Sequence, residues 1–466
     1  MQDKKTPSLT LSLIPLVTIA LFLGIGYGVF RIRAEILLVC SAGVAGVLAQ
    51  SLGYTWKEME AGIVDSIRQA LPAMLIVITV GMLIGSWIAS GTIPMLVFYG
   101  IKLVSPGFFL VTASLVCSVV SLFTGTSWGT VGTVGIAFMG IAHGLGIPAG
   151  AAAGAIVSGA YFGDKLSPFS DTTNLAPVAA RSNLFDHIRH LLWTTTPAWL
   201  LGMVIYLFVG LSFKGQTLPE QQLQELLVTL RTFQFNVLLL TPPVIVLWFA
   251  VRKKPVIPGM VLASLWASLL GFIIQNNSLQ VTLNAMTTGY VADTGNEMID
   301  NLLTRGGMMS MMDVTLIALC AFGFAGIVQV SGMLQVILDH LLKIVRNTGS
   351  LIASAAGASV AVAIMTGSSF LSILIPGELF RSAFKQRDLA AKNLSRTTED
   401  SGTVIVPLVP WSMAGVYMAG TLGVPTLEYA KWAFMCYLGV VFAILYGFTG
   451  IGIARRKRDD ETLSGS

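Results

Sequence analysis

The sequence is built from successive apolar runs of about 20 residues, the length at which an α-helix crosses the hydrocarbon core of a bilayer. Only 11% of the residues are charged, which excludes an ordinary soluble domain, where roughly 25% are charged. A transmembrane β-barrel is excluded as well, because its strands alternate polar and apolar residues. The sequence therefore predicts an all-α polytopic membrane protein.

The number of apolar runs predicts roughly 10 to 12 transmembrane spans in a single membrane transport domain over residues 1–466. Shorter mixed segments at 91–104 and 333–346, and polar amphipathic ones at 55–70 and 282–305, are expected to lie at the interface or to re-enter the membrane. The runs lie at about 9–30, 34–52, 71–90, 106–123, 126–145, 148–162, 188–211, 233–251, 256–275, 313–331, 349–366, 403–424 and 429–453.

Short motifs recur in the two halves of the chain in the same order. Ser90-Gly91 recurs as Ser331-Gly332, Thr124-Gly125-Thr126-Ser127-Trp128 as Thr366-Gly367-Ser368-Ser369-Phe370, and Ser170-Asp171-Thr172-Thr173 as Glu399-Asp400-Ser401-Gly402-Thr403. We infer two homologous halves: repeat 1 at about 8–211, a polar linker at about 212–232, and repeat 2 at about 233–453.

Basic residues between the apolar runs set the expected orientation by the positive-inside rule. Lys4 and Lys5, the cluster at 252–254 and the basic tail at 454–466 are all expected in the cytoplasm, together with both termini. Arg31 and Arg33 would then lie outside, against the rule. With this orientation the two halves are inverted repeats with discontinuous or re-entrant helices, an architecture in which substrates bind near the bilayer midplane.

A polar segment, residues 163–177, follows a long stretch that is almost free of charge. Its two prolines and its glycine are expected to break a helix and to free backbone carbonyls. Its carboxylate, hydroxyl and amide oxygens suit a hard cation such as Na+, although a solvated loop uses the same residue types. The candidate ion- or proton-binding residues here are Asp171 and Asp164, with Ser170, Thr172, Thr173 and Asn174.

The counterpart in the second half supplies Asp400, Glu399 and Ser401 as further candidates. Carboxylates inside membrane segments are costly and usually functional, here as cation ligands or proton carriers. A structural ion pair of these carboxylates with Lys165 or Arg396 is the alternative.

The repeated Thr-Gly-Thr-Ser and Thr-Gly-Ser-Ser motifs combine a helix-loosening glycine with hydroxyl groups. They are expected to line the substrate pathway, and close helix packing through small residues is the alternative. Glu378 interrupts an apolar run and is a further pathway candidate, unless it simply reaches water. The four histidines lie near predicted helix ends and are expected at the interface. The pathway candidates are Thr126, Ser127, Ser368, Ser369 and Glu378.

The sequence contains no GxxxxGK[ST] phosphate loop and no recognisable nucleophile with a base, so it gives no support for ATP-driven transport or for an intramembrane enzyme. The basic residues lie mainly between apolar runs, where they serve topology and not nucleic-acid binding. We therefore expect no enzymatic activity, no cofactor and no metal beyond a transported ion.

The segment Gly163-Asp164-Lys165-Leu166-Ser167-Pro168-Phe169-Ser170-Asp171-Thr172-Thr173-Asn174-Leu175-Ala176-Pro177 resembles the signature of the NhaC-type Na+/H+ antiporter family. The resemblance extends to 124–128 and 399–402, and it implies a bacterial inner-membrane transporter that exports Na+ against entering protons by alternating access. The same family includes exchangers that couple these ions to malate and lactate. Exchange of an organic acid, or of another small carboxylate or amino acid, stays open, as does assembly into a homodimer.

Overall fold

The computed structural model of the chain describes residues 4–27, 29–213, 220–252, 254–295, 300 and 303–456. Within these ranges the regular elements are helices, and strand-like pairing is confined to two isolated bridges, Tyr290 with Arg305 and Leu389 with Arg455. The all-α class is confirmed, as expected for apolar segments that must satisfy their backbone hydrogen bonds within each helix.

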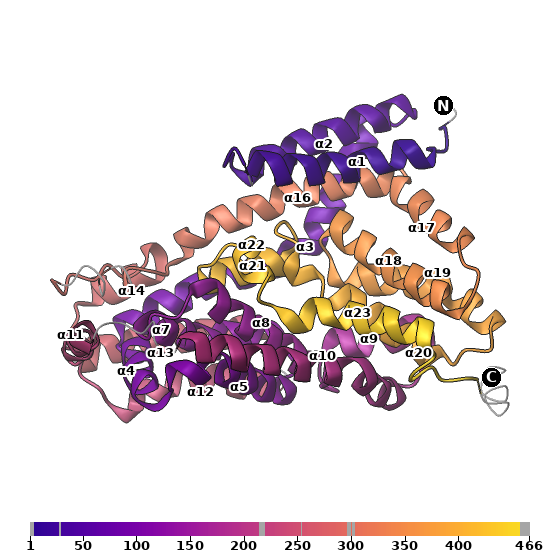
Figure 1. The fold of residues 1–466 in the computed structure, drawn as a ribbon. Helices are drawn as coiled ribbons and strands as arrows, with labels where there is room; N and C mark the ends of the chain where they lie inside the picture. Colours follow the sequence, from indigo (N-terminus) through magenta and orange to yellow (C-terminus); the bar gives the residue numbers. More distant parts are fainter. Residues whose placement is uncertain are drawn as a thin grey trace.

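The helices follow one another along the chain as drawn in Figure 1. The first half contains α1 Leu9–Leu21, η1 Phe22–Tyr27, α2 Ala34–Ser51, α3 Trp56–Ala89, α4 Thr92–Leu103, η2 Pro106–Phe108, α5 Phe109–Thr124, α6 Ser127–Thr130, η3 Val131–Gly135, α7 Ile136–Gly144, α8 Ala149–Leu166, α9 Asp171–Ala180, α10 Leu184–Ser212 and α11 Glu220–Leu230. The second half contains η5 Val237–Leu240, α12 Thr241–Val251, α13 Val256–Ile274, α14 Leu279–Thr288, η6 Met308–Met311, α16 Met312–Val330, α17 Met333–Lys343, α18 Thr348–Thr366, α19 Ser369–Gln386, α20 Ala391–Thr398, η7 Glu399–Thr403, η8 Val406–Leu408, α21 Met413–Leu422, α22 Thr426–Ala430 and α23 Phe434–Thr449.

Eight helices in the described ranges are long and apolar enough to cross a membrane. A bent pair, Ala391–Leu408 with Met413–Leu422, makes an angle of 47° and would be a ninth span. The described helices thus give eight or nine candidate spans, fewer than the expected 10 to 12. Three shorter apolar helices in the described ranges account for part of the difference, namely Thr92–Leu103, Val237–Val251 and Phe434–Thr449. The chain is a multi-pass membrane protein.

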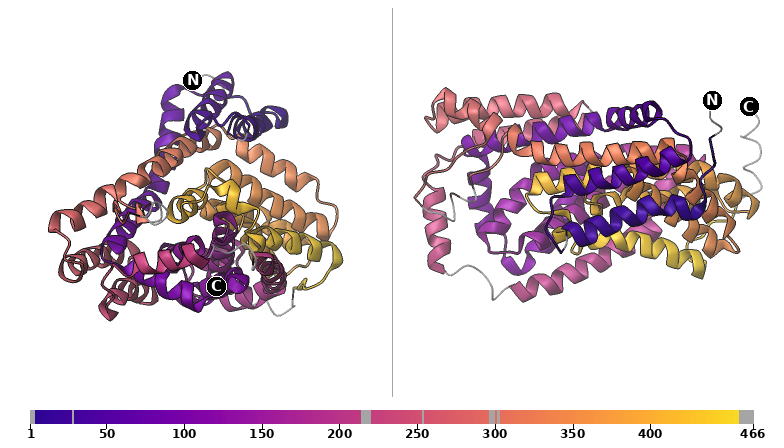
Figure 2. Two further views of the ribbon diagram at one scale, coloured as in Figure 1. Left: turned by 60° about the vertical axis from the view of Figure 1, so that its left-hand side comes forward. Right: turned by 90° about the horizontal axis from the view of Figure 1, so that it is seen from above.

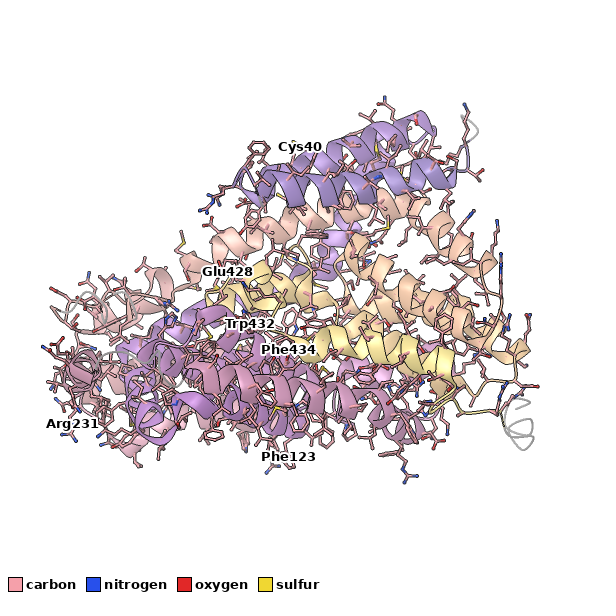
Figure 3. All side chains as sticks on the ribbon, in the orientation of Figure 1. Cys40, Phe123, Arg231, Glu428, Trp432 and Phe434 are labelled. Carbon is pink, nitrogen blue, oxygen red and sulfur yellow. The ribbon has the colours of Figure 1, made fainter. Side chains whose placement is uncertain are left out.

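Most of the long helices lie side by side and run along the length of the molecule, so that their termini gather at its two ends (Figures 1 and 2). α11 and α14 lie at one end, and α17 and α20 lie at the other. Large apolar side chains are exposed along the sides, for example Phe123, Val47 and Phe208, which are 64%, 68% and 68% exposed. Figure 3 shows Phe123 on one outer side and Cys40 of α2 on another. An apolar surface of this extent is expected to contact lipid.

The amphipathic segment 55–70 was expected at the interface, but it forms the first part of the continuous helix α3. α3 continues through Pro72, and close packing holds its first part against α16. At the crossing, a Cβ on Gly62 would lie only 2.7 Å from the carbonyl oxygen of Gly326, so the two backbones approach through glycine. In the other amphipathic segment, 282–305, the described residues form the end of α14 and an irregular stretch.

The two halves of the chain pack into each other. α2 of the first half packs on α16 of the second, and α13 of the second half packs on α3 of the first. α3 and α16 also contact each other, so these two long helices join both halves at the centre of the molecule. Neither half could bury its apolar faces in the same way alone.

The repeated Ser-Gly pairs adopt the same backbone conformation. Gly91 precedes α4 with φ +85°, and Gly332 precedes α17 with φ +73°, a region that glycine occupies readily. α4 and α17 lie at opposite ends of the molecule (Figure 1), as inverted halves require. The inverted relation of the complete halves and their boundaries stay predictions. Of the linker, residues 214–219 lie outside the described residues, as do 457–466 of the tail.

Candidate functional site

Two helix breaks with the same geometry, one from each half, reach the candidate site. α5 ends at Gly125 with φ +68°, and the hydroxyl of Thr126 then caps α6 by accepting a hydrogen bond from the Gly129 amide at 3.1 Å. α18 ends at Gly367 with φ +64°, and Ser368 caps α19 in the same way. The recurrence of these motifs in the sequence therefore corresponds to a recurring structure.

Gly125 provides a test of this geometry. Gly125→Ala is expected to destabilise the fold by about 1–2 kcal/mol or more, because an L-residue is strained at positive φ. Its Cβ would also lie 2.5 Å from the Cβ of Phe169. Thermal unfolding of the purified protein measures the effect. Gly357→Ala in α18 is the matched control, because its Cβ would meet nothing within 4 Å. Equal melting temperatures for the two variants would contradict the argument.

The polar segment 163–177 is a short break between two helices and not a long loop. α8 continues through Gly163, where a Cβ would lie 2.2 Å from the carbonyl oxygen of Ser118, so this glycine permits close packing with α5. α9 contains Pro177 in its interior, although this proline was expected to end a helix. The break is confined to residues 167–170 around Pro168. It places Asp164 in the last turn of α8 and Asp171 in the first turn of α9.

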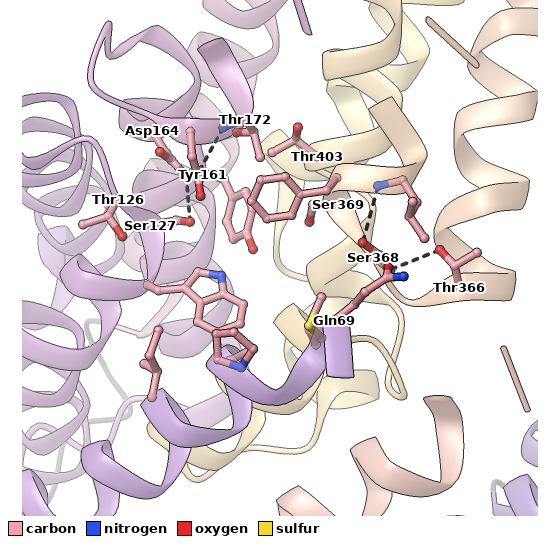
Figure 4. Close-up of a pocket in the computed structure, with 18 of the residues that line it drawn as sticks. Gln69, Thr126, Ser127, Tyr161, Asp164, Thr172, Thr366, Ser368, Ser369 and Thr403 are labelled. Carbon is pink, nitrogen blue, oxygen red and sulfur yellow. Dashed lines mark hydrogen bonds between the residues drawn. The ribbon is translucent and has the colours of Figure 1, made fainter. Parts of the chain in front are cut away.

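A cavity of about 590 Å³ lies between these breaks. Residues from the motifs of both halves line it, as Figure 4 shows. The helices α3, α13 and α16 supply further wall residues, including Ser66, Gln69 and Gln329. The lining residues that were predicted as site residues are Thr126, Ser127, Asp164, Asp171, Thr172, Ser368 and Ser369.

Two carboxylates face this cavity. Asp164 is 5% exposed, and its Oδ2 accepts a hydrogen bond from the Ser127 hydroxyl at 2.8 Å (Figure 4). Its Oδ1 has no hydrogen-bond partner among the described residues. Asp171 is accessible from the cavity, and its Oδ1 accepts a hydrogen bond from the Thr172 amide at 2.8 Å. Each carboxylate is thus held in place and keeps acceptor capacity for a cation or a proton.

Two further carboxylates lie in the π-helical turn η7, outside the lining of the cavity. Asp400 and Lys165 form an ion pair in which both side chains are fully buried, with 2.5 Å between Oδ1 and Nζ. Glu399 is also fully buried, and its Oε1 accepts a hydrogen bond from the Thr173 hydroxyl at 3.3 Å. Its Oε2 lies 3.5 Å from Nε2 of His187. The expected alternative, an ion pair with Lys165, is therefore present.

Buried negative charge exceeds buried positive charge in this region. The buried carboxylates of Asp164, Glu399 and Asp400, with the cavity-facing Asp171 beside them, lie near only two permanent cations among the described residues. One is Lys165, and the other is Arg396, which is fully buried and donates to the Gly452 carbonyl at 2.8 Å. Unpaired buried charges are costly. The cluster should therefore take up protons or bind a cation.

The remaining predicted residues have different positions. Ser170 caps α9 and lies 3.1 Å from the Thr172 hydroxyl, and Asn174 donates to the carbonyls of Pro168 and Ser170. The Ser401 hydroxyl is buried without a partner among the described residues. Glu378 is exposed on α19 and does not line the cavity, so the structure separates it from the cluster.

Several site residues escaped the sequence analysis. Ser66 and Gln69 lie in the segment assigned to the interface, and Gln329 is a lone polar residue in an apolar run. His187 and His190 were expected at the interface but are 0% and 6% exposed. A polar side chain inside an apolar run was the available signal for Gln329. The same signal existed for His190 within the run 188–211, but not for His187, and the partners of both come from α20, some 200 positions away.

Comparison with known proteins places this arrangement in a family. The profile described as the Na+/H+ antiporter family matches residues 159–451. An uncharacterised Na+/H+ antiporter of Haemophilus influenzae is 46% identical over 453 residues, covering 95% of this chain and 96% of that protein. The Na+/H+ antiporter NhaC of Alkalihalophilus pseudofirmus is 39% identical over 431 residues, covering 92% and 93%.

A relative named for a different activity is similar over nearly the whole chain as well. The malate-2H+/Na+-lactate antiporter of Bacillus subtilis is 34% identical over 452 residues, covering 97% of this chain and 96% of that protein. The resemblance of residues 163–177 to the NhaC-type signature is confirmed by these matches. The chain belongs to the Na+/H+ antiporter family.

Proposed function

We propose that the chain is a secondary active transporter that exchanges Na+ for H+ across the bacterial inner membrane, with both termini in the cytoplasm. Membership of the Na+/H+ antiporter family supports Na+ and H+ as the transported ions. The observation that carries the proposal is the excess of buried carboxylates over buried cations beside a cavity lined by both halves. Arg33, one of the two exceptions to the positive-inside rule, is paired with Glu35 at 2.6 Å and with Asp313 at 3.2 Å, which offsets its charge.

In this proposal Na+ binds where Asp164 and Asp171 face the cavity. Carboxylate and hydroxyl oxygens are the ligands that hard cations prefer, and Ser127 and Thr172 supply hydroxyls beside the carboxylates. Protons compete for the same carboxylates, so that the site holds either Na+ or protons when it faces each side. This competition couples the two fluxes.

Alternating access would use the helix breaks at Gly125 and Gly367. Discontinuous helices let one part of a helix move without the other, and the resulting states expose the site to opposite sides. α5 and α6 belong to the first half, and α18 and α19 to the second, and both breaks border the cavity.

Purified protein in liposomes tests the proposal directly. An internal pH dye reports proton movement after external addition of Na+, Li+, K+, malate or lactate, each on its own. Proton movement in response to Na+ alone is the expected result. Silence with Na+ alone would overturn the proposal, and it would favour carboxylate-coupled exchange if malate and lactate on opposite sides restored the response.

The proton is proposed to reach the site through His187. Its Nδ1 lies 2.9 Å from the Ser395 hydroxyl, which lies 3.1 Å from the hydroxyl of the partly exposed Ser182. Its Nε2 lies beside Glu399. An imidazole with an oxygen atom near each nitrogen can accept a proton on one side and release it on the other.

His187→Gln is therefore expected to slow Na+/H+ exchange about tenfold, because glutamine can hydrogen-bond but cannot carry the proton. Exchange of labelled Na+ for unlabelled Na+ should keep its rate. The matched control is His190→Gln, since His190 is also buried but bonds to Asn393 at 3.1 Å, outside this chain of contacts. Equal losses in the two variants would exclude His187 as the carrier.

A second candidate function, exchange of a small organic acid coupled to these ions, is favoured by the size of the cavity. At about 590 Å³ it is far larger than a bare Na+ ion requires, and it falls in the range of small-molecule sites. Phe322, Phe370 and Met413 contribute apolar wall that would suit a carbon skeleton. The liposome experiment above separates the two candidates.

A further inference from the structure

A second cavity of about 460 Å³ shares no lining residue with the first. It lies among α4, α7, the end of α14 and the end of α21, at the end of the molecule away from α17 and α20 (Figure 1). Ile84, Ile88 and Met139 contribute apolar wall. Its described lining contains one permanent charge, Arg305. The proposed ion exchange makes no use of this cavity.

Arg305 is held in place by its backbone. Its carbonyl accepts a hydrogen bond from the Tyr290 amide at 3.1 Å. The next residue, Gly306, has φ +86° and is pressed against α3, where an added Cβ would lie 2.3 Å from the Gly85 nitrogen. This close contact fixes the segment that carries the arginine.

The guanidinium of Arg305 has five N–H donors, and among the described residues its hydrogen-bond contact is with Nε2 of His143 at 3.4 Å. Among the described residues it forms no ion pair. A partly buried guanidinium without a carboxylate is unusual, since charges taken from water are normally paired.

Thr421 of α21 is a second group without a partner in the same cavity. It is 5% exposed, it lines the cavity, and its hydroxyl has no hydrogen-bond partner among the described residues. Buried hydroxyls are normally satisfied, so an unpartnered one beside a cavity points to a ligand.

Stabilisation of a helix end is the simpler explanation for Arg305, and it is incomplete. The guanidinium lies beside Gly423, which ends α21, and a cation is favourable at the C-terminus of a helix. This explains the position of the charge. It leaves the Thr421 hydroxyl and the cavity itself without a role.

We propose that this second cavity binds a small organic carboxylate. The fork of the Arg305 guanidinium matches the two oxygens of a carboxylate, the Thr421 hydroxyl donates a further hydrogen bond, and the apolar wall contacts the carbon skeleton. The volume lies within the range of small-molecule sites. The proposal concerns binding alone and does not depend on ion exchange at the first cavity.

Thermal unfolding of the full-length protein in detergent tests this site. Sodium malate and sodium lactate are titrated against sodium chloride at equal Na+ concentration and ionic strength. The carboxylate salts are expected to raise the melting temperature in a saturable way, and Arg305→Gln should weaken the apparent affinity about 10- to 100-fold. Arg305→Lys keeps the charge but not the forked geometry, so its carboxylate affinity should lie between those of the native protein and Arg305→Gln.

Thr421→Val keeps the test valid if the arginine variants fold poorly. Valine has nearly the same shape as threonine, and the hydroxyl that is lost has no partner, so the unliganded variant should be at least as stable as the native protein. Its affinity for the carboxylate should fall, because one hydrogen-bond donor is missing. Lys102→Gln, at an exposed position on α4, should leave affinity unchanged. Asp171→Asn should keep carboxylate binding, which separates this proposal from the ion-exchange proposal. The carboxylate-binding proposal would be overturned if chloride raised the melting temperature equally, or if both Arg305→Gln and Thr421→Val kept the native affinity.

Discussion

Asp171→Asn is expected to abolish coupled Na+/H+ exchange while the protein still inserts and folds. Asp171 faces the cavity, where its carboxylate supplies negative charge for Na+ and a position for the proton. Asparagine keeps the acceptor for the Thr172 amide, which bonds at 2.8 Å in the native protein, so the first turn of α9 should survive. The variant loses the charge on which the competition of the two ions depends. Exchange should fall at least about a hundredfold.

The measurement is Na+-driven proton movement in liposomes that contain equal amounts of each variant. Asp164→Asn is expected to show a comparable loss, because Asp164 is nearly buried and faces the same cavity. The matched control is Asp313→Asn, since the Asp313 side chain is 78% exposed and its partner is the exposed Arg33. Near-normal exchange in Asp171→Asn would remove this carboxylate from the mechanism.

The parts of the site that the sequence predicted are those encoded by local patterns. The positions of the helix breaks could be read from Gly125 and Gly367, because a glycine followed by a capping hydroxyl ends one helix and begins the next. The same patterns put Thr126 and Ser368 among the site residues, and both line the cavity. The prediction of an all-α membrane protein likewise followed from the length of the apolar runs.

The parts that the sequence could not predict depend on contacts between distant segments. Pro168 and Pro177 are equivalent as helix breakers, yet only the first lies in a break. Gly62 permits the close crossing of α3 and α16 through its contact with Gly326, which lies far along the chain. His187 and Glu399 are brought together from positions 212 residues apart, and neither position by itself indicates the other. Tertiary packing decides each of these cases.

The buried ion pair of Lys165 and Asp400 leads to the second large expected effect. Lys165→Met should destabilise the fold by about 3–5 kcal/mol, because it leaves a fully buried carboxylate without its partner. Oδ2 of Asp400 already has no hydrogen-bond partner among the described residues, so nothing at hand replaces the lost contact. Asp400→Asn should also destabilise, since it leaves the fully buried Lys165 ammonium unpaired.

The double variant Lys165→Met/Asp400→Asn is expected to recover much of the lost stability, because it contains no unpaired buried charge. Denaturant unfolding of all four proteins gives the coupling between the two residues. If both single variants are as stable as the native protein, the pair does not have the buried environment argued here.

Exchange activity of the double variant then distinguishes the two interpretations of this pair. A purely structural pair would let the double variant regain both stability and Na+/H+ exchange. We expect stability without exchange, because Asp400 belongs to the group of buried carboxylates whose charge exceeds that of Lys165 and Arg396. Removing one carboxylate and one cation together leaves the net charge of the group unchanged. A loss of exchange in the double variant would therefore show that the positions of these charges matter, and not only their sum.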